Sequence, residues 1–192
     1  SPVLQGGESS EFLYLHRRQE INLPFAKWGE SVARRMKWSC RCYYIHMIKI
    51  IAIGKKHDKE LADAIERYQQ RLRPPFEVQW LLLPYSAHDG NRARDEESAA
   101  IMKHLSNNEK VILLDERGSQ MTSPQFSAEL QKGSVTIIIG GAYGVNDELR
   151  RRSDVMLSLS KMVMPHQIVR LVLIEQIYRA QAIANHHPYH HE

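Results

Sequence analysis

Residues 135–144, VTIIIGGAYG, decide the fold. The first five form a short, mostly apolar run rich in β-branched residues, which predicts a buried strand over Val135–Ile139. Three of the next five residues, Gly140–Gly144, are glycines, and a ligand can approach the backbone closely there because no Cβ intervenes. In doubly wound α/β proteins, ligands lie beyond the carboxyl ends of the strands. This stretch therefore predicts both a strand and a candidate site at its end.

Strands and helices alternate five times along the rest of the chain. Four further runs of the same character predict strands over Ile48–Gly54, Phe76–Leu83, Val111–Leu114 and Val155–Leu159. Capping residues and helical spacing predict five helices. The first runs from Asp58 to the Pro74-Pro75 pair, and the second follows the polar stretch Ser86–Arg94 and ends at about Leu105. The other three run from Ser123-Pro124 to about Gln131, over Asn146–Arg152 and over Pro165–Asn185. This alternation predicts an α/β fold with a mostly parallel sheet.

Composition places the chain among globular proteins. It has 192 residues, 43% of them apolar and 25% charged, with a formal net charge of +4. No apolar run approaches the length of about 18 residues that would indicate a membrane span, and no secretory h-region is apparent. Cys40 and Cys42 are too few for a disulfide framework. We therefore expect a soluble cytoplasmic protein, and the basic excess only weakly favours an acidic partner such as nucleic acid.

The charge is concentrated in the first 46 residues. This segment carries seven Lys and Arg against four Glu, so it holds +3 of the net charge of +4. It lacks a sustained helical or strand period, whereas a regular pattern begins directly after Met47. We interpret residues 1–46 as an extension outside the fold and residues 47–192 as the domain. The alternative is a basic RNA-binding arm, which would usually have a denser run of Lys and Arg.

Three loops at predicted strand ends are candidates for binding. They are Leu114–Gly118, Gly140–Gly144 and Leu159–His166. The glycine loop lacks the spacing of the dinucleotide fingerprint and the lysine of a phosphate-binding loop, so a nucleoside triphosphate is disfavoured. The third loop is mainly apolar and suits a flat heterocycle held by main-chain groups. The alternative for Met162 and Met164 is to fill gaps in the packing, and His166 is either a helix cap or a substrate contact.

The last predicted helix is apolar around nearly its whole circumference. The apolar residues that together cover it are Ile168, Val169, Leu171, Val172, Leu173, Ile174, Ile177, Ala180 and Ile183. A helix of this kind is buried on two sides, and in so small a domain the second side is best provided by another subunit. We therefore predict a homodimer with this helix at the interface; the alternative is a central core helix in a monomer.

Three motifs together resemble one known family. They are IIIGGAYG at 137–144, LSLSKMVMPHQIVRLVLIEQIYRA at 157–180 and the terminal HHPYHHE at 186–192. The resemblance is to the SPOUT-class methyltransferases, and within them to the small bacterial enzymes that methylate N3 of a pseudouridine in large-subunit ribosomal RNA. It covers residues 47–192 and leaves residues 1–46 outside.

The resemblance implies a fold, a cofactor and a partner. The fold is a SPOUT-type parallel sheet flanked by helices with a C-terminal trefoil knot, an exception to the rule that chains do not knot. The cofactor is S-adenosylmethionine, held in the knot by residues that stand here in the matching motifs: Leu114, Gly140, Leu159, Ser160, Lys161, Met162, Val163 and Met164. The functional assembly is an obligate homodimer that binds ribosomal RNA across its interface, with the assembled ribosome as the expected target.

The reaction needs little covalent help from the protein. The sulfonium cofactor already activates the methyl group, and the imide nitrogen N3 attacks well only after losing its proton. Matching the family's arginine and terminal Pro-Tyr-His, we assign His190 to accept the proton, Arg179 to hold phosphate or the developing anion, and Tyr189 to orient the base. Glu175 lies four residues before Arg179, so a plain ion pair is the alternative for that arginine. The family often has Lys or Arg at the position of His191. The neutral histidine of this chain weakens a phosphate contact there.

Other clusters have simpler explanations. Arg150, Arg151 and Arg152 could contact RNA phosphate, or could only complement a helix C-terminus. The tail histidines have no carboxylate or cysteine at ligand spacing, so we predict no metal site. Two rival functions stay open: methylation of another RNA, and a ribosome- or RNA-binding factor that has lost the reaction.

Overall fold

The computed structural model describes residues 47–191, and the extension inferred for residues 1–46 lies outside that range. The described residues contain five strands: β1 (Ile48–Ile53), β2 (Val78–Leu83), β3 (Lys110–Ser119), β4 (Val135–Ile139) and β5 (Val155–Leu157). All neighbouring strands pair in parallel, in the order β2-β1-β4-β3-β5. The predicted parallel α/β fold is confirmed, while the trefoil knot stays a prediction.

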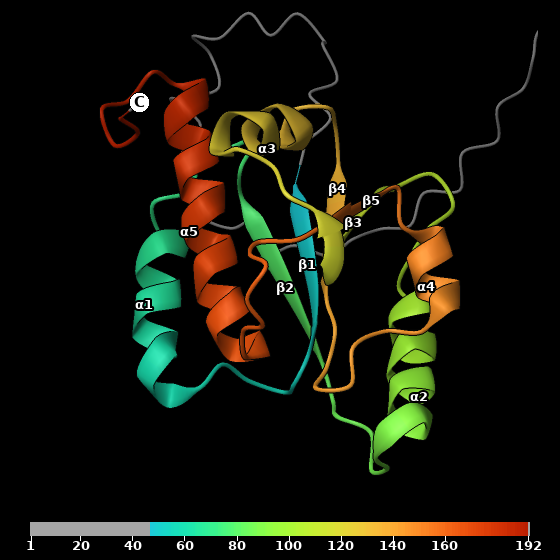
Figure 1. Ribbon diagram of the computed structural model, residues 1–192. Coiled ribbons are helices and arrows are strands. Elements are labelled where there is room, and N and C mark those ends of the chain that lie inside the picture. Colours follow the sequence, from blue (N-terminus) through green and yellow to red (C-terminus); the bar gives the residue numbers. More distant parts are fainter. Residues whose placement is uncertain (1–46, 192) are drawn as a thin grey trace, which may run out of the picture. The chain divides into compact units, whose positions relative to one another are not determined.

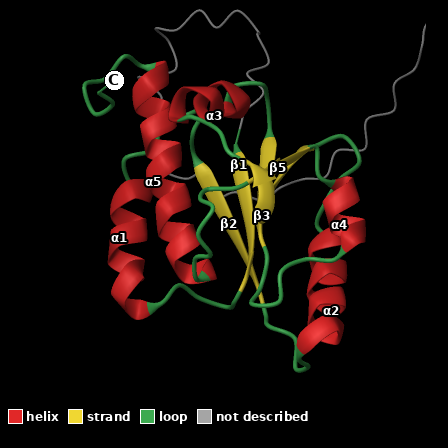
Figure 2. Cartoon of the chain, viewed as in Figure 1, coloured by secondary structure: helices red, strands yellow, loops and turns green. Residues whose placement is uncertain are grey.

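Five helices cover the two faces of this sheet (Figures 1 and 2). On one face lie α1 (Lys59–Gln69), α3 (Ser123–Leu130) and α5 (His166–Ala184), and on the other lie α2 (Gly90–Met102) and α4 (Asp147–Arg152). Alternate β1 residues supply the two cores: Ile50 packs in the core that includes α5, and Ile51 in the core that includes Ile101 of α2. Near-continuous apolar strands are expected where both faces are covered.

The carboxyl ends of β3 and β5 differ from the prediction by two residues or more, and β2 begins at Val78 instead of Phe76. Val111–Leu114 was expected to end in a turn, but β3 continues to Ser119 with a register shift against β5 between Leu114 and Ser119. At Gly118 a Cβ would lie 2.6 Å from the backbone carbonyl of Met156, so only glycine lets the two strands approach this closely. On the other strand, β5 ends at Leu157 instead of Leu159, which leaves Ser158 and Leu159 in the following loop.

The start of α2 also differs. It begins at Gly90, inside the stretch Ser86–Arg94 that we expected to be a polar connection, and it ends at Met102. The buried face of its first turns is small and polar, with Ala93, Glu97 and Ser98, so apolar periodicity gives little sign of a helix there.

The long helix α5 is buried on the side that faces the sheet, between α1 and α3. Leu173, Ile174, Ile177 and Ala180 are fully buried, whereas Ile168 is 39% exposed. The single chain therefore covers one side of α5 and leaves apolar side chains on the other. No helix among residues 47–191 is long and apolar enough to cross a membrane.

Candidate functional site

A cavity of about 740 Å³ lies at the carboxyl ends of β3, β4 and β5. It is lined by the three loops that follow these strands, as expected for ligands of a parallel α/β sheet. Seven of the eight residues assigned to the cofactor line it: Leu114, Gly140, Leu159, Ser160, Met162, Val163 and Met164. Lys161 is not among the lining residues.

The glycine loop is shaped by close packing on its outer side. A Cβ at Gly140 would lie 2.9 Å from Val145 Cγ1, and a Cβ at Gly141 would overlap the Glu97 carboxylate. Gly144 has φ +71° and its N–H donates to the Gly141 carbonyl, 3.0 Å away, which closes the loop as a tight turn. The side chains that glycine lacks at 140 and 141 would displace the wall of the cavity.

The third loop is fixed by its own serines. Ser158 Oγ donates to the Ser160 carbonyl (2.7 Å), and Met162 N–H donates to Ser160 Oγ (2.9 Å). These bonds hold a turn that projects Met162 and Val163 outward, with 77% and 81% of their surfaces exposed. Apolar side chains this exposed at the mouth of a cavity indicate a binding surface.

His166 joins this loop to α5 and lines the cavity. Its Nε2 lies 2.7 Å from the hydroxyl of Tyr85, a residue in the loop after β2. Burial and the nearby Arg170 lower the pKa of His166, which outweighs the opposite influence of Asp58 and Glu97. The imidazole is therefore neutral at neutral pH and is fixed by Tyr85.

Arg170, one turn further along α5, anchors the helix to the end of β1. Its side chain is completely buried, and Nη2 donates to the carbonyls of Ile53 (2.6 Å) and Gly54 (3.3 Å), while Nη1 donates to that of Lys56 (2.8 Å). Burial lowers the pKa of Arg170. Sequence reasoning missed this residue because an arginine within a helix is usually exposed to solvent, and the chain before it gives no sign of the contact with β1.

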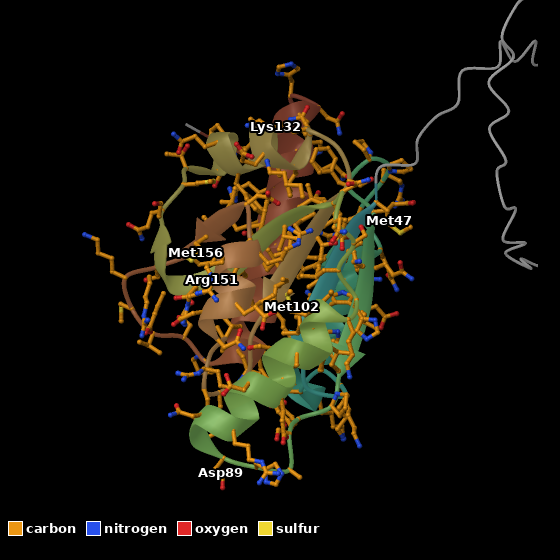
Figure 3. All side chains as sticks on the ribbon, turned by 90° about the vertical axis from the view of Figure 1, so that its right-hand side faces the viewer. Met47, Asp89, Met102, Lys132, Arg151 and Met156 are labelled. Atoms are coloured by element: carbon orange, nitrogen blue, oxygen red, sulfur yellow. The ribbon has the colours of Figure 1, made fainter. Side chains whose placement is uncertain are left out.

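The three arginines of α4 divide into different roles. Arg150 Nε donates to Asp115 (2.9 Å) and Nη1 to Asp147 (3.0 Å), and these bonds outweigh burial and raise its pKa. Arg152 donates to the carbonyls of Ser106 and Glu109. Of the three, only Arg151 is exposed; it is labelled in Figure 3. Two of the three side chains therefore hold loops in place.

Arg179 and the tail form a second cluster, centred on Glu175. Glu175 Oε1 accepts from Arg179 Nε (3.1 Å) and Nη2 (2.6 Å) and from the Tyr189 hydroxyl (3.0 Å). Arg179 also stacks on the Tyr189 ring, with Cζ 4.8 Å from its centroid. The ion pair considered as an alternative for Arg179 is present, and it ties the arginine to the tail.

The ionisable groups of this cluster have defined states. Burial, followed by hydrogen bonds with Tyr68 and Glu175, raises the pKa of Tyr189, so the phenol stays protonated and donates to Glu175. The hydrogen bond from Arg179 to Glu175 raises the pKa of Arg179. His190 Nδ1 is buried and has no hydrogen-bond partner among residues 47–191.

The two clusters lie toward opposite ends of α5. His166 begins this helix and Arg179 follows 13 residues later, a rise of about 20 Å at 1.5 Å per residue. Figure 1 shows the C-terminal tail at the other end of α5 from the loops that line the cavity. A single chain therefore does not bring Arg179, Tyr189 and His190 to the cavity. Within residues 47–191, no three His, Cys, Asp or Glu side chains are grouped as metal ligands.

Comparisons with known proteins agree on one family. The family model described as "Predicted SPOUT methyltransferase" matches residues 47–190. A protein of Desulfitobacterium hafniense named "Ribosomal RNA large subunit methyltransferase H" is 40% identical over 156 residues, covering 74% of this chain and 98% of that protein. A protein of the same name from Geobacter sulfurreducens is 37% identical over 163 residues, covering 75% and 99%.

Proposed function

Because the chain belongs to the SPOUT methyltransferase family, we propose that it transfers a methyl group from S-adenosylmethionine to N3 of a pseudouridine in large-subunit ribosomal RNA. The observation that carries this proposal is the cavity at the ends of β3, β4 and β5, lined by seven of the eight residues assigned to the cofactor. The names of the relatives, which refer to the large-subunit RNA, support the choice of substrate.

The cavity fits this cofactor in size and character. Its volume suits a ligand of drug-like size. The glycines at 140 and 141 expose backbone to the ligand, and Leu159 and Met164 give apolar walls for a flat adenine ring. When bound, S-adenosylmethionine supplies a methyl group activated by its sulfonium. The work of the chain is then to orient the acceptor and to remove its proton.

We assign that work to the cluster around Glu175. Its carboxylate holds the Arg179 guanidinium and the Tyr189 hydroxyl, and so fixes both at one edge of α5. Arg179 stabilises the negative charge that develops on the base or holds a phosphate, and the Tyr189 ring orients the base. His190, next to Tyr189 in the tail, receives the N3 proton.

The separation of the two clusters supports a homodimer. Groups about 20 Å apart along one helix cannot act on one nucleotide, but an antiparallel second copy would bring its own tail to the cavity of the first. The partly exposed apolar side of α5, with Ile168 at its start, provides a surface for such pairing. We place the activity in residues 47–192 and treat residues 1–46 as an extension. A ribosomal substrate supports a cytoplasmic location.

Two measurements test the proposal. Calorimetric titration should detect binding of S-adenosylmethionine, and an absence of binding would favour an RNA-binding factor that has lost the reaction. Mass mapping of ribosomal RNA should show loss of one methyl group from a large-subunit pseudouridine when the gene is deleted. If that pseudouridine keeps its methyl group and a different RNA loses one, the assigned substrate is wrong.

A further inference from the structure

Glu97 is a buried carboxylate directly behind the glycine loop. It lies on α2, is 5% exposed, and its Oε1 accepts from the backbone N–H of Ser86 at 3.0 Å. Its Oε2 has no hydrogen-bond partner within residues 47–191 and fills the space that a Cβ at Gly141 would need. Leaving a buried acceptor oxygen unpaired is unfavourable, so this placement needs an explanation.

The neighbouring residue shows that α2 supports both ends of the same loop. Ser98 is 1% exposed, and its Oγ accepts from the backbone N–H of Asn146 at 2.9 Å. Holding the loop therefore needs only a neutral hydroxyl at one end, whereas a carboxylate stands at the other. Support of the loop explains the burial of Glu97 but leaves its free oxygen unexplained.

The other charges around the cavity make this carboxylate distinctive. Arg94, Arg117 and Arg150 line the cavity, together with Asp115 and Glu116. Asp115 is bound to Arg150, and Glu116 is exposed to solvent, which screens its charge. Arg170 adds a completely buried positive charge on the α5 side. Glu97 differs from these two carboxylates. It is buried behind the cavity wall, and no positively charged side chain within residues 47–191 forms an ion pair with it.

We propose that Glu97 makes the cavity prefer the positively charged sulfonium cofactor over its neutral thioether product, an inference that rests on the proposed function. In the transfer, the N3 lone pair forms the new N–C bond, the electrons of the S–C bond return to sulfur, and the N3 proton goes to the base. The sulfonium charge is thereby lost. A fixed buried carboxylate attracts the cofactor before this step and no longer attracts the product after it, so exchange of product for fresh cofactor is favoured.

Glu97→Gln tests this inference because it removes the charge, keeps the size and leaves an oxygen for the Ser86 N–H. Calorimetry on the full chain would compare S-adenosylmethionine with S-adenosylhomocysteine. We expect affinity for the sulfonium compound to fall about tenfold, as for a buried charge at close range, and affinity for the thioether to change by less than about twofold. Glu148→Gln, which removes an exposed carboxylate of α4 that does not line the cavity, should leave the ratio of the two affinities nearly unchanged.

The outcomes separate this inference from the proposed function. If Glu97→Gln weakens both ligands equally, or leaves their ratio unchanged, Glu97 only supports the loop and the inference is wrong. Glu97→Asp keeps the charge and should retain the preference, which gives a second test should the glutamine variant fold poorly. If the unaltered chain binds neither compound, the proposed function fails, and the inference fails with it.

Discussion

Glu175→Gln should lower methyl transfer without changing cofactor binding. Glu175 Oε1 accepts two hydrogen bonds from Arg179 and one from Tyr189, so this single oxygen positions both assigned residues. The amide keeps the shape of the side chain but loses the charge that attracts the guanidinium. Arg179 and the tail should then sample several positions instead of one.

The size of the effect follows from the burial of the pair. The side chains of Glu175 and Arg179 are 18% and 27% exposed, so solvent weakens their interaction only in part. A charge-assisted hydrogen bond in this setting contributes about 1–2 kcal/mol after allowance for screening. If the lost positioning appears in full in the transition state, kcat falls about 5- to 30-fold.

Turnover would be measured by mass spectrometry of methyl transfer to ribosomal particles that lack the modification, and cofactor affinity by calorimetry. Glu66→Gln is the matched control, because Glu66 is an exposed carboxylate on α1 whose one side-chain hydrogen-bond partner among residues 47–191 is Gln70. The reasoning is refuted if Glu175→Gln keeps full turnover, or if it weakens cofactor binding as much as it lowers kcat.

Three further substitutions test other parts of the structure. Gly140→Ala places a methyl group 2.9 Å from Val145 Cγ1. It should lower the free energy of unfolding by about 1–3 kcal/mol and weaken cofactor binding in calorimetry. Unchanged binding would contradict the close approach of the ligand to this backbone. Arg170→Met removes the donors to three carbonyls and should lower the free energy of unfolding by about 3 kcal/mol in urea titrations. An unchanged free energy of unfolding would show that the buried guanidinium makes no net contribution to stability. Burial alone raises the pKa of Glu109, but hydrogen bonds from Thr136, from a backbone N–H and from a lysine lower it overall. Its stabilisation is therefore present above the ordinary carboxyl pKa of about 4.3 and lost as the pH falls below it, and Glu109→Gln should make the melting temperature less dependent on pH in that range.

The fold was predictable where local signals agree with the tertiary structure. The apolar strands, the paired prolines and the glycine loop each act locally, and each strand prediction corresponds to an observed strand. The residues that cap the helices were predicted less accurately than the strands. Ser123 was expected to cap α3, but Thr122 does so, in a capping box with Gln125. Asp58 stands at the N-cap of α1 without a side-chain cap bond, and its N–H instead donates to Gln167 of α5.

The cavity could be anticipated because its lining comes from short segments that directly follow strands. Parallel strands bring their carboxyl ends to one edge of the sheet, so predicting the strands also predicted that the three loops would meet. Glu97 and Arg170 could not be found in this way. Each lies within a helix, and nothing in the sequence distinguishes Glu97 from the neighbouring surface carboxylates or Arg170 from a solvent-exposed arginine. Their roles come from backbone groups 11 and 117 residues away, the N–H of Ser86 and the carbonyl of Ile53.

The relation between the cavity and the tail was the hardest part to predict. Motif order placed Leu159–Met164 and Tyr189-His190 within about 30 residues of each other, a spacing that suggests one site. The chain between them contains the continuous 19-residue helix α5, and a helix separates its ends by about 1.5 Å per residue instead of bringing them together. The two motifs therefore lie apart within one chain. The proposed reaction needs the tail at the cavity, so we propose that a second copy of the chain supplies it.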